Sequence, residues 1–332
     1  MHFDEGIQRF LEKELPGAGA WGIRKLKGDA STREYFRCRV PDSETAILTL
    51  YPEPFDPAES TYLQVYRMLR RIGLPIPRIH AVDGDLGAVL QEDLGDMTLE
   101  RRLRGAGTRE RKRLLCQAAQ HLIVLQRKGP QAADPDWPVL QLAFDLEKLT
   151  WELQFFRRHF LEGYSSVRVE REKLASECLA LCGELAEAER FVCHRDYQVR
   201  NLMLKEGRVY MIDFQDARLG PQAYDLVSLL LDSIDLPPGE VEELVDFYLQ
   251  GGAPAVDAGQ FRRQFHLAAI QRLLKALGTF GYQAGALGRE AYGAYIPGTL
   301  ERVSAALKTI PEFPYIQALV EAQVAAAGRV SC

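Results

Sequence analysis

Long apolar runs and a surplus of basic residues are both missing from this chain of 332 residues. A run of about 18 apolar residues, the length that a transmembrane helix needs, does not occur in the sequence. The N-terminal stretch MHFDEGIQRFLEKEL is amphipathic and lacks the apolar centre of a secretory signal. The net charge of −5 shows no basic excess of the kind that marks general nucleic-acid binders. We therefore expect a cytoplasmic protein, monomeric or weakly dimeric, with neither a membrane nor a nucleic acid as partner.

Clustered cysteines are missing as well. A scatter of cysteines over a long chain argues against a disulfide framework, and the six in this sequence are Cys38, Cys116, Cys178, Cys182, Cys193 and Cys332. Cys178 and Cys182 share a predicted helix, but two ligands do not make a zinc site. With 47% apolar and 26% charged residues, the composition is that of an ordinary globular protein, in which such thiols are simply buried.

The first part of the chain has the pattern of a small antiparallel sheet with one inserted helix. Short alternating or apolar runs separated by Gly, Pro, Asp and Ser indicate strands joined by turns. After a leading helix at 2–15, strands are predicted at 22–27, 33–40, 46–51, 78–82 and 88–91, and a helix at 57–72.

Helical periodicity dominates the remainder of the chain. Helices are predicted at 96–104, 108–128, 144–162, 168–188, 238–250, 260–280 and 298–308, and a hairpin with arms at 202–205 and 208–212 interrupts them. The small-residue tail at 325–328 is predicted to fray. The fold class is therefore α+β, with a small β-rich N-lobe at 1–93 and a larger helical C-lobe at 94–332. A cleft between two such lobes is a natural ligand site.

The residues that point to chemistry follow one another closely in the C-lobe. Asp196 lies on a predicted loop, Asn201 follows five residues later, and Asp213 ends the second arm of the hairpin. Phosphoryl transfer needs a group that orients or deprotonates the attacking hydroxyl, and metal ions that neutralise the phosphate oxygens. Carboxylate and amide oxygens suit Mg²⁺. We predict Asp196 as the base and Asn201 and Asp213 as metal ligands; the alternative is an Asp in a turn and an Asp capping a loop.

This arrangement resembles the catalytic and metal-binding loops of the eukaryotic-like kinase superfamily. His194 to Asn201 matches the spacing H-R-D-x-x-x-x-N, and Asp213-Phe214-Gln215 stands where that superfamily has Asp-Phe-Gly. The resemblance implies a bilobal protein-kinase-like fold that uses ATP and Mg²⁺. No Ala-Pro-Glu signature or activation segment follows Asp213, and about a hundred residues of predicted helix precede the catalytic loop. In this the chain resembles the aminoglycoside phosphotransferase and choline kinase branch.

Asp225 belongs to a Tyr-Asp-Leu element that matches the same branch. The resemblance implies that Asp225 braces the catalytic loop, through Arg195 for example. A charge near the N-terminus of a helix is an equally good interpretation of this residue.

A closer resemblance extends over most of the chain. It rests on the stretches Gly28–Arg37, Glu92–Asp96, His194–Met203 and Gln271–Phe280, which are similar to those of the N-acetylmuramate/N-acetylglucosamine anomeric kinases. That family phosphorylates the C1 hydroxyl of a small sugar in the recycling of bacterial cell walls. The resemblance places the loop Gly28, Asp29, Ala30, Ser31 and Thr32, with Arg33, over the phosphates. It places Glu92 and Leu94 in the connector that meets adenine, and it implies a catalytic role for Arg200, one residue before Asn201, in steadying the transferring phosphate or the substrate.

One departure from the superfamily concerns the third strand. Thr49 stands where the superfamily has a lysine, and the following helix offers Arg67, or Glu59 earlier on, where a partner glutamate would lie. Phosphate anchoring must then differ, and Arg33 or Arg37 could supply the charge. A kinase for an aminoglycoside, choline or homoserine stays open, as does an inactive nucleotide-binding module. An acidic rim would favour a cationic acceptor, and a basic rim would favour the carboxylate of N-acetylmuramate.

Overall fold

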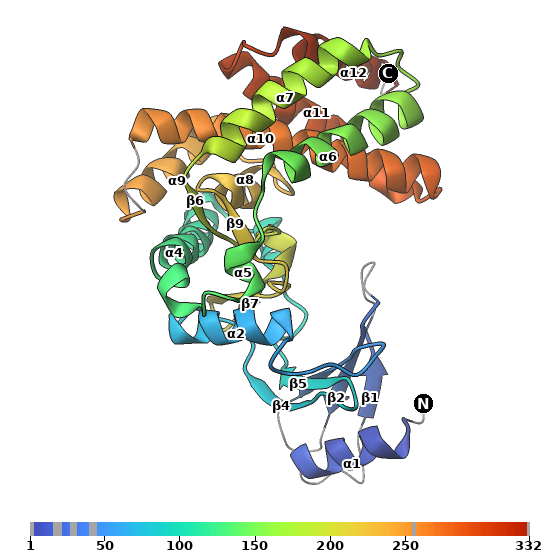
Figure 1. Ribbon diagram of the computed structural model, residues 1–332, viewed down its shortest axis with the longest axis vertical. Coiled ribbons are helices and arrows are strands. Elements are labelled where there is room, and N and C mark those ends of the chain that lie inside the picture. The colour runs from blue at the N-terminus through green and yellow to red at the C-terminus, as the bar shows by residue number, and fades with distance from the viewer. Residues whose placement is uncertain (1–2, 16–21, 27–31, 40–44, 254–256, 331–332) are drawn as a thin grey trace.

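The computed structural model describes residues 3–15, 22–26, 32–39, 45–253 and 257–330. Figure 1 shows a sheet with one helix beneath it at one end of the molecule and a larger helical part at the other. This is the α+β, two-lobed arrangement that the sequence predicts. The division near residue 93 stays a prediction, because the helix α2 (Thr61–Arg71) contributes Val65 and Met68 to the hydrophobic core of the helical part.

The sheet of the N-lobe is antiparallel, and its described strands lie in the order β1-β2-β3-β5-β4. Its strands are β1 (Gly22–Lys25), β2 (Glu34–Arg39), β3 (Ala46–Leu50), β4 (Ile79–Asp83) and β5 (Ala88–Glu92). The helix α1 (Glu5–Glu14) covers one face, because Phe10 and Leu11 pack in one cluster with Phe36 and Leu48 of the sheet. The other face is turned toward the C-lobe. All of these elements were predicted from the sequence to within a few residues.

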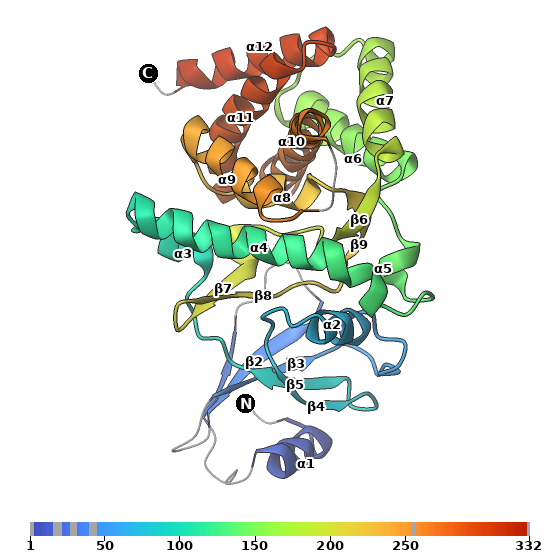
Figure 2. The ribbon, with the colours of Figure 1, turned by 90° about the vertical axis from the view of Figure 1, so that its left-hand side faces the viewer.

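The C-lobe is organised around a long buried helix, α10 (Ala258–Gly281). Figure 2 shows α6, α7, α11 and α12 around it, with α4 crossing below. The remaining helices are α3 (Leu99–Leu103), α4 (Thr108–Ala132), α5 (Pro138–Gln141), α6 (Leu146–Phe156), α7 (Arg171–Glu187), α8 (Tyr224–Leu231), α9 (Pro238–Gln250), α11 (Ile296–Thr309) and α12 (Pro314–Val330). π-helical segments, Arg157–Tyr164 and Tyr282–Ala286, continue α6 and α10, and a 3₁₀-helix spans Glu290–Tyr295.

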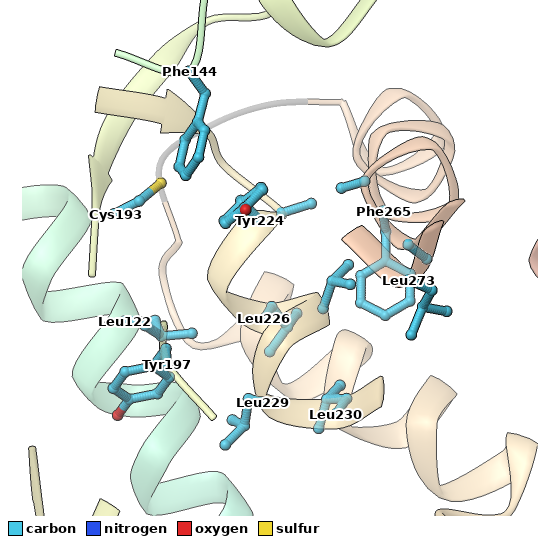
Figure 3. Close-up of a cluster of buried hydrophobic side chains, with 14 of the residues drawn as sticks. Leu122, Phe144, Cys193, Tyr197, Tyr224, Leu226, Leu229, Leu230, Phe265 and Leu273 are labelled. Carbon is cyan, nitrogen blue, oxygen red and sulfur yellow. The ribbon is translucent and has the colours of Figure 1, made fainter. Parts of the chain in front are cut away.

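The short helix α8 forms the centre of the C-lobe core. Figure 3 shows Leu226, Leu229 and Leu230 of α8 between α4 and the α10 residues Phe265 and Leu273. The sequence pattern did not predict α8, because a helix that is buried on all sides lacks the one-sided periodicity on which such predictions rest. Its place in the core makes it a rigid support for the loops beside it.

Two strand pairs carry the loops of interest. β6 (Arg190–Cys193) pairs with β9 (Arg218–Pro221), and β7 (Leu202–Lys205) pairs with β8 (Arg208–Met211). The chain passes from β6 through a loop to β7, then along the predicted hairpin to β8, and through a second loop to β9. Because β9 returns to lie beside β6, both loops emerge at the same place.

The C-terminal tail corrects one prediction. Residues 325–328 were expected to fray, but they lie inside α12. Alanine is the best helix former, and Ile316 and Val320 of the same helix are buried in the core. The Glu177 carboxylate also accepts the backbone N–H groups of Tyr315 and Ile316, at 2.8 Å each, in the first turn. Among the residues described, no helix is long and apolar enough to cross a membrane.

Candidate active site

The loop that carries Asp196 is held in an unusual backbone conformation. Arg195 has φ +82°, a left-handed value that costs a non-glycine residue on the order of 1–3 kcal/mol. The Asp225 carboxylate accepts the backbone N–H groups of His194 and Arg195, the latter at 3.0 Å. Arg272 of α10 donates to the carbonyl oxygen of Arg195 at 2.8 Å. These contacts confirm the predicted brace by Asp225, which acts on the backbone rather than on the Arg195 guanidinium.

The Asp196 carboxylate is surrounded by cations. Its oxygens lie 3.6 Å from Arg272 Nη2, 3.9 Å from Lys275 Nζ and 3.7 Å from Arg195 Nε. Burial alone would raise its pKa, but the charges of Lys275, Arg272 and Arg195 outweigh burial and hold the pKa well below its usual range. Asp196 is therefore an ionised, weak base at every physiological pH. Such a carboxylate orients a hydroxyl well and accepts its proton only as the hydroxyl becomes acidic.

Arg272 is the support on which this electrostatic arrangement depends. Its side chain is 1% exposed and forms an ion pair with Asp232, with Nη2 to Oδ2 at 2.7 Å. It also packs over the ring of Tyr224, 4.9 Å from the centroid. One buried guanidinium thus joins α8, α10 and the catalytic loop. Because Asp232 neutralises it, Arg272 can lie next to Asp196 without an unpaired charge in the core.

Asn201 and Asp213 lie close to Asp196. The side-chain Nδ2 of Asn201 donates to the backbone carbonyl oxygen of Asp196 at 2.9 Å. The backbone carbonyl oxygen of Asn201 accepts from Ile212 N at 3.1 Å. His194 Nε2 donates to the carbonyl of Ile212 at 3.0 Å, so the two loops are joined directly before Asp213. Asp213 has φ +65° and accepts from Gln215 Nε2 at 2.9 Å.

A cavity of about 340 Å³ lies between the lobes, with Asn201 and Asp213 at its C-lobe end. This volume lies in the ordinary range for a small-molecule site. Apolar side chains from both lobes line it, namely Leu26, Ile47, Val89, Leu94, Met203 and Ile212. The connector residues Glu92, Asp93 and Leu94 line this cavity, and a contact of Glu92 and Leu94 with the nucleotide stays a prediction. Glu92 also accepts Lys205 Nζ at 2.8 Å, which ties the connector to the C-lobe.

Of the predicted phosphate loop, Gly28, Asp29, Ala30 and Ser31 lie outside the described residues. Thr32 is exposed, and Arg33 lines the cavity. The guanidinium of Arg33 lies over the ring of Tyr51, 5.5 Å from its centroid, and Asp213 is near enough for its charge to act on the pKa of Arg33.

Arg37 has a different place. Its guanidinium donates to Asp93 Oδ1 and to Asp96 Oδ1, both at 2.9 Å, so its charge is used at the connector. Of the two arginines considered for the phosphates, the structure brings Arg33 toward Asp213 and ties Arg37 to the connector.

Thr49, which the family resemblance places at the position of the usual strand lysine, is buried and lines the cavity. Its cross-strand neighbours are Tyr35 on β2 and Val89 on β5. Arg67 donates to the carbonyl of Pro57, and Glu59 precedes α2. A tyrosine, Tyr62, is the side chain that α2 contributes to the cavity wall. Its hydroxyl donates to Gln91 at 2.6 Å, and its ring stacks on Phe214 at 5.0 Å. An aromatic contact therefore fixes the residue next to Asp213.

Two further placements concern Arg200 and α10. The guanidinium of Arg200 donates to Ser233 Oγ at 3.5 Å, while its backbone belongs to the 3₁₀ turn Val199–Asn201 beside Asp196.

Arg272 and Lys275 were not named as site residues from the sequence. Their signal was the Gln271–Phe280 stretch of the family resemblance, which the structure brings next to Asp196.

The geometry now has a counterpart among known proteins. Residues 22–282 match the model of a family described as the phosphotransferase enzyme family. The chain belongs to this family. It is 31% identical over 302 residues to a protein of Neisseria meningitidis serogroup B named N-acetylmuramate/N-acetylglucosamine kinase, with 88% of this chain and 87% of the relative covered.

Solved structures show the same fold. A choline/ethanolamine kinase family protein from Mesorhizobium loti has a TM-score of 0.60 at 17% identity, covering 95% of this chain and 98% of the other. An aminoglycoside phosphotransferase with ADP bound has a TM-score of 0.59 at 17% identity, covering 92% and 98%. The protein-kinase-like fold expected from the sequence is thereby confirmed.

Proposed function

We propose that this phosphotransferase transfers the γ-phosphate of ATP to the anomeric hydroxyl of N-acetylglucosamine or N-acetylmuramate. The observation that carries the proposal is the ionised Asp196, held by Arg272 and Lys275 on the loop whose Asn201 lines the same cavity as Asp213. The name of the Neisseria relative supports the choice of acceptor.

The side chains of this site divide the work of phosphoryl transfer among them. Asp196 orients the acceptor hydroxyl and takes up its proton, and the low pKa of this carboxylate makes it a weak base. A C1 hydroxyl is more acidic than a primary alcohol, so a weak base suits it. Arg33 holds the phosphate chain from the N-lobe in place of the lysine that Thr49 replaces. Wild-type protein should therefore turn over, unlike an inactive nucleotide-binding module.

The residues proposed to hold a metal ion fit Mg²⁺. Asn201 and Asp213 offer oxygen atoms, the donors that Mg²⁺ prefers, and Mg²⁺ usually completes its shell with water and phosphate oxygens. Within the described ranges, no group of three or more His, Cys, Asp and Glu side chains has the spacing of a metal site. This agrees with an ion held mainly by the nucleotide. When bound, Mg²⁺ neutralises charge on the phosphate oxygens.

The charge beside Asp196 separates the acceptor classes. Lys275, Arg195 and Arg272 approach the carboxylate, and Arg218 and Lys148 lie within electrostatic reach of Arg195. Although Asp216, Asp232 and Glu152 pair with some of these cations, the surroundings favour a neutral or anionic sugar over a positively charged aminoglycoside or choline.

A panel of acceptors tests the proposal. ADP release is measured with N-acetylglucosamine, N-acetylmuramate, kanamycin, choline and homoserine, and phosphorus NMR identifies the product. We expect turnover with the two sugars and a phosphate that couples to H1. A product whose phosphate couples to the two H6 protons would overturn the anomeric assignment. Turnover restricted to kanamycin, choline or homoserine would overturn the sugar.

A further inference from the structure

The side of Asp196 that faces α6 and α10 carries more positive charge than the base itself requires. Lys275 of α10, Arg195 of the catalytic loop and Arg218 of β9 all act on the pKa of Lys148 on α6, together with Glu152. These groups therefore form one electrostatic cluster. Because the acceptor hydroxyl must approach the Asp196 carboxylate, and the cavity that contains Asn201 and Asp213 serves the nucleotide, the rest of the acceptor lies against this cluster.

Arg195, Arg218 and Lys275 are already engaged at the catalytic loop or at the base. Arg195 Nη1 pairs with Asp216 Oδ2 at 2.7 Å. Arg218 Nε donates to the carbonyl oxygen of Asp216 at 3.1 Å and packs over the ring of Phe144. Lys275 lies 3.9 Å from Asp196, where the acceptor hydroxyl itself must bind. Their charges are used to shape the catalytic loop and the base.

Lys148 differs from the others. Its ammonium is 3.8 Å from Glu152 Oε1, which is beyond hydrogen-bond length, and Glu152 is buried and accepts from Gln271 Nε2 at 2.9 Å. Burial lowers the pKa of Lys148, and repulsion by Arg195, Arg218 and Lys275 adds to this, while Glu152 opposes it. A charge in such surroundings is stabilised by any anion that comes within hydrogen-bond distance.

Trp151 holds Lys148 where a ligand can reach it. The ammonium lies over the indole ring, 4.5 Å from the centroid, and the two residues are neighbours on one face of α6. The side chain of Lys148 is 29% exposed and Trp151 is 55% exposed. Trp151 thus offers an exposed aromatic face beside this half-buried cation, and aromatic side chains contribute large contact areas to binding sites.

We propose that Lys148, positioned by Trp151, binds the carboxylate of an acidic sugar and so selects N-acetylmuramate over N-acetylglucosamine. The inference rests on the proposed function, because it assigns a specificity residue to the same acceptor site. In N-acetylmuramate the carboxylate belongs to an ether on C3, two ring atoms from C1. Lys275 lies 3.9 Å from Asp196, at the place of the reacting hydroxyl, whereas Lys148 is half-exposed on α6. We therefore assign the carboxylate to Lys148 rather than to Lys275.

The test compares the two sugars in Lys148→Met, Lys148→Arg and a matched control. The control is Lys173→Met on a different helix, α7. Like Lys148, Lys173 lies over an aromatic ring, that of Tyr315, and forms an ion pair with a glutamate, Glu170. The quantity measured is kcat/KM for N-acetylmuramate divided by kcat/KM for N-acetylglucosamine, at constant ionic strength. A charge-assisted hydrogen bond lost from a half-buried site corresponds to roughly a 10- to 100-fold change.

We expect that ratio to fall roughly 10- to 100-fold in Lys148→Met, to return largely in Lys148→Arg, and to stay at the wild-type value in Lys173→Met. A ratio that is unchanged in Lys148→Met, with both sugars still turned over, overturns this inference and leaves the proposed function standing. A wild-type enzyme that turns over N-acetylglucosamine but not N-acetylmuramate also overturns it. Turnover of neither sugar by wild-type protein overturns the proposed function and this inference with it.

Discussion

At the scale of single residues, the charge on Asp196 is the property that matters most. We expect Asp196→Asn to cut kcat by roughly 10²- to 10⁴-fold, the usual cost of losing a general base. The amide has nearly the same size and shape as the carboxylate, and the side chain at this position is partly exposed. The Tm should therefore change little. Asp85→Asn, in the exposed turn between β4 and β5, is the control. A loss of turnover smaller than about threefold would remove Asp196 from this role.

Lys275 controls how far Asp196 stays ionised in acid. Because Lys275 is one of the cations that lower the pKa of Asp196, its removal raises that pKa, and a larger share of the carboxylate is then protonated as pH falls. We expect Lys275→Met to move the acidic limb of the kcat/KM profile to higher pH. The alkaline side should be less affected. An acidic limb at the same pH in both proteins would contradict the electrostatic account.

Arg33 is the residue that we propose to hold the phosphates in place of the strand lysine that is lacking at Thr49. We expect Arg33→Met to raise the KM for ATP by roughly tenfold, the cost of about one charge-assisted contact, and Arg33→Lys to restore part of the affinity. Arg39→Met, at the exposed end of strand β2, which begins directly after Arg33, should have no such effect. Equal KM values in all of these proteins would show that the phosphates are anchored elsewhere.

At the scale of elements, the close crossing of α10 and α6 positions the cations. A Cβ added at Gly278 would lie 2.7 Å from Phe156 Cα and 2.9 Å from Phe156 N, both backbone atoms that cannot easily move. We expect Gly278→Ala to lower the free energy of unfolding by about 1–3 kcal/mol. It should also lower kcat, because displacing α10 moves Arg272 and Lys275 away from Asp196.

The matched control for that substitution is Gly183→Ala on α7, where an added Cβ meets no atom within 4 Å. In an open helical position alanine should stabilise by about 0.5–1 kcal/mol, because glycine loses more conformational entropy on folding. Urea denaturation of the two variants measures both effects. Equal and favourable changes in both variants would show that the α10–α6 contact is looser than the structure describes.

At the scale of the whole molecule, we expect nucleotide and metal to join the lobes across the cavity. A ligand that binds the folded state at about 100 times its Kd adds roughly 2.7 kcal/mol of stability. We expect ATP to raise the Tm more with Mg²⁺ than with EDTA. In Asp213→Ala the Mg²⁺-dependent part should disappear together with activity, and in Asp85→Ala it should persist. An unchanged Mg²⁺ titration in Asp213→Ala would exclude this residue from the metal site.

The sheet, most helices and the catalytic loops could be predicted from the sequence because their signals are local. Strand alternation and turn residues mark the N-lobe, and Asp196 and Asn201 stand at a fixed spacing on one loop. The strand around Thr49 was predicted correctly, and its sequence contains no lysine; that Thr49 stands at the lysine position stays a prediction. Short buried elements such as α8 were not predicted, since they are buried on every side and show no periodic alternation of buried and exposed positions.

The tertiary structure decided everything that depends on residues distant in the chain. Only in the folded protein does Asp225 reach the backbone of Arg195, and Arg272 reach both Asp232 and Asp196. Likewise the sequence left Arg33 and Arg37 equivalent, and folding tied Arg37 to Asp93. The physical reason is that a side chain's charge can be counted in the sequence, whereas the energy of that charge depends on its neighbours and on its distance from water.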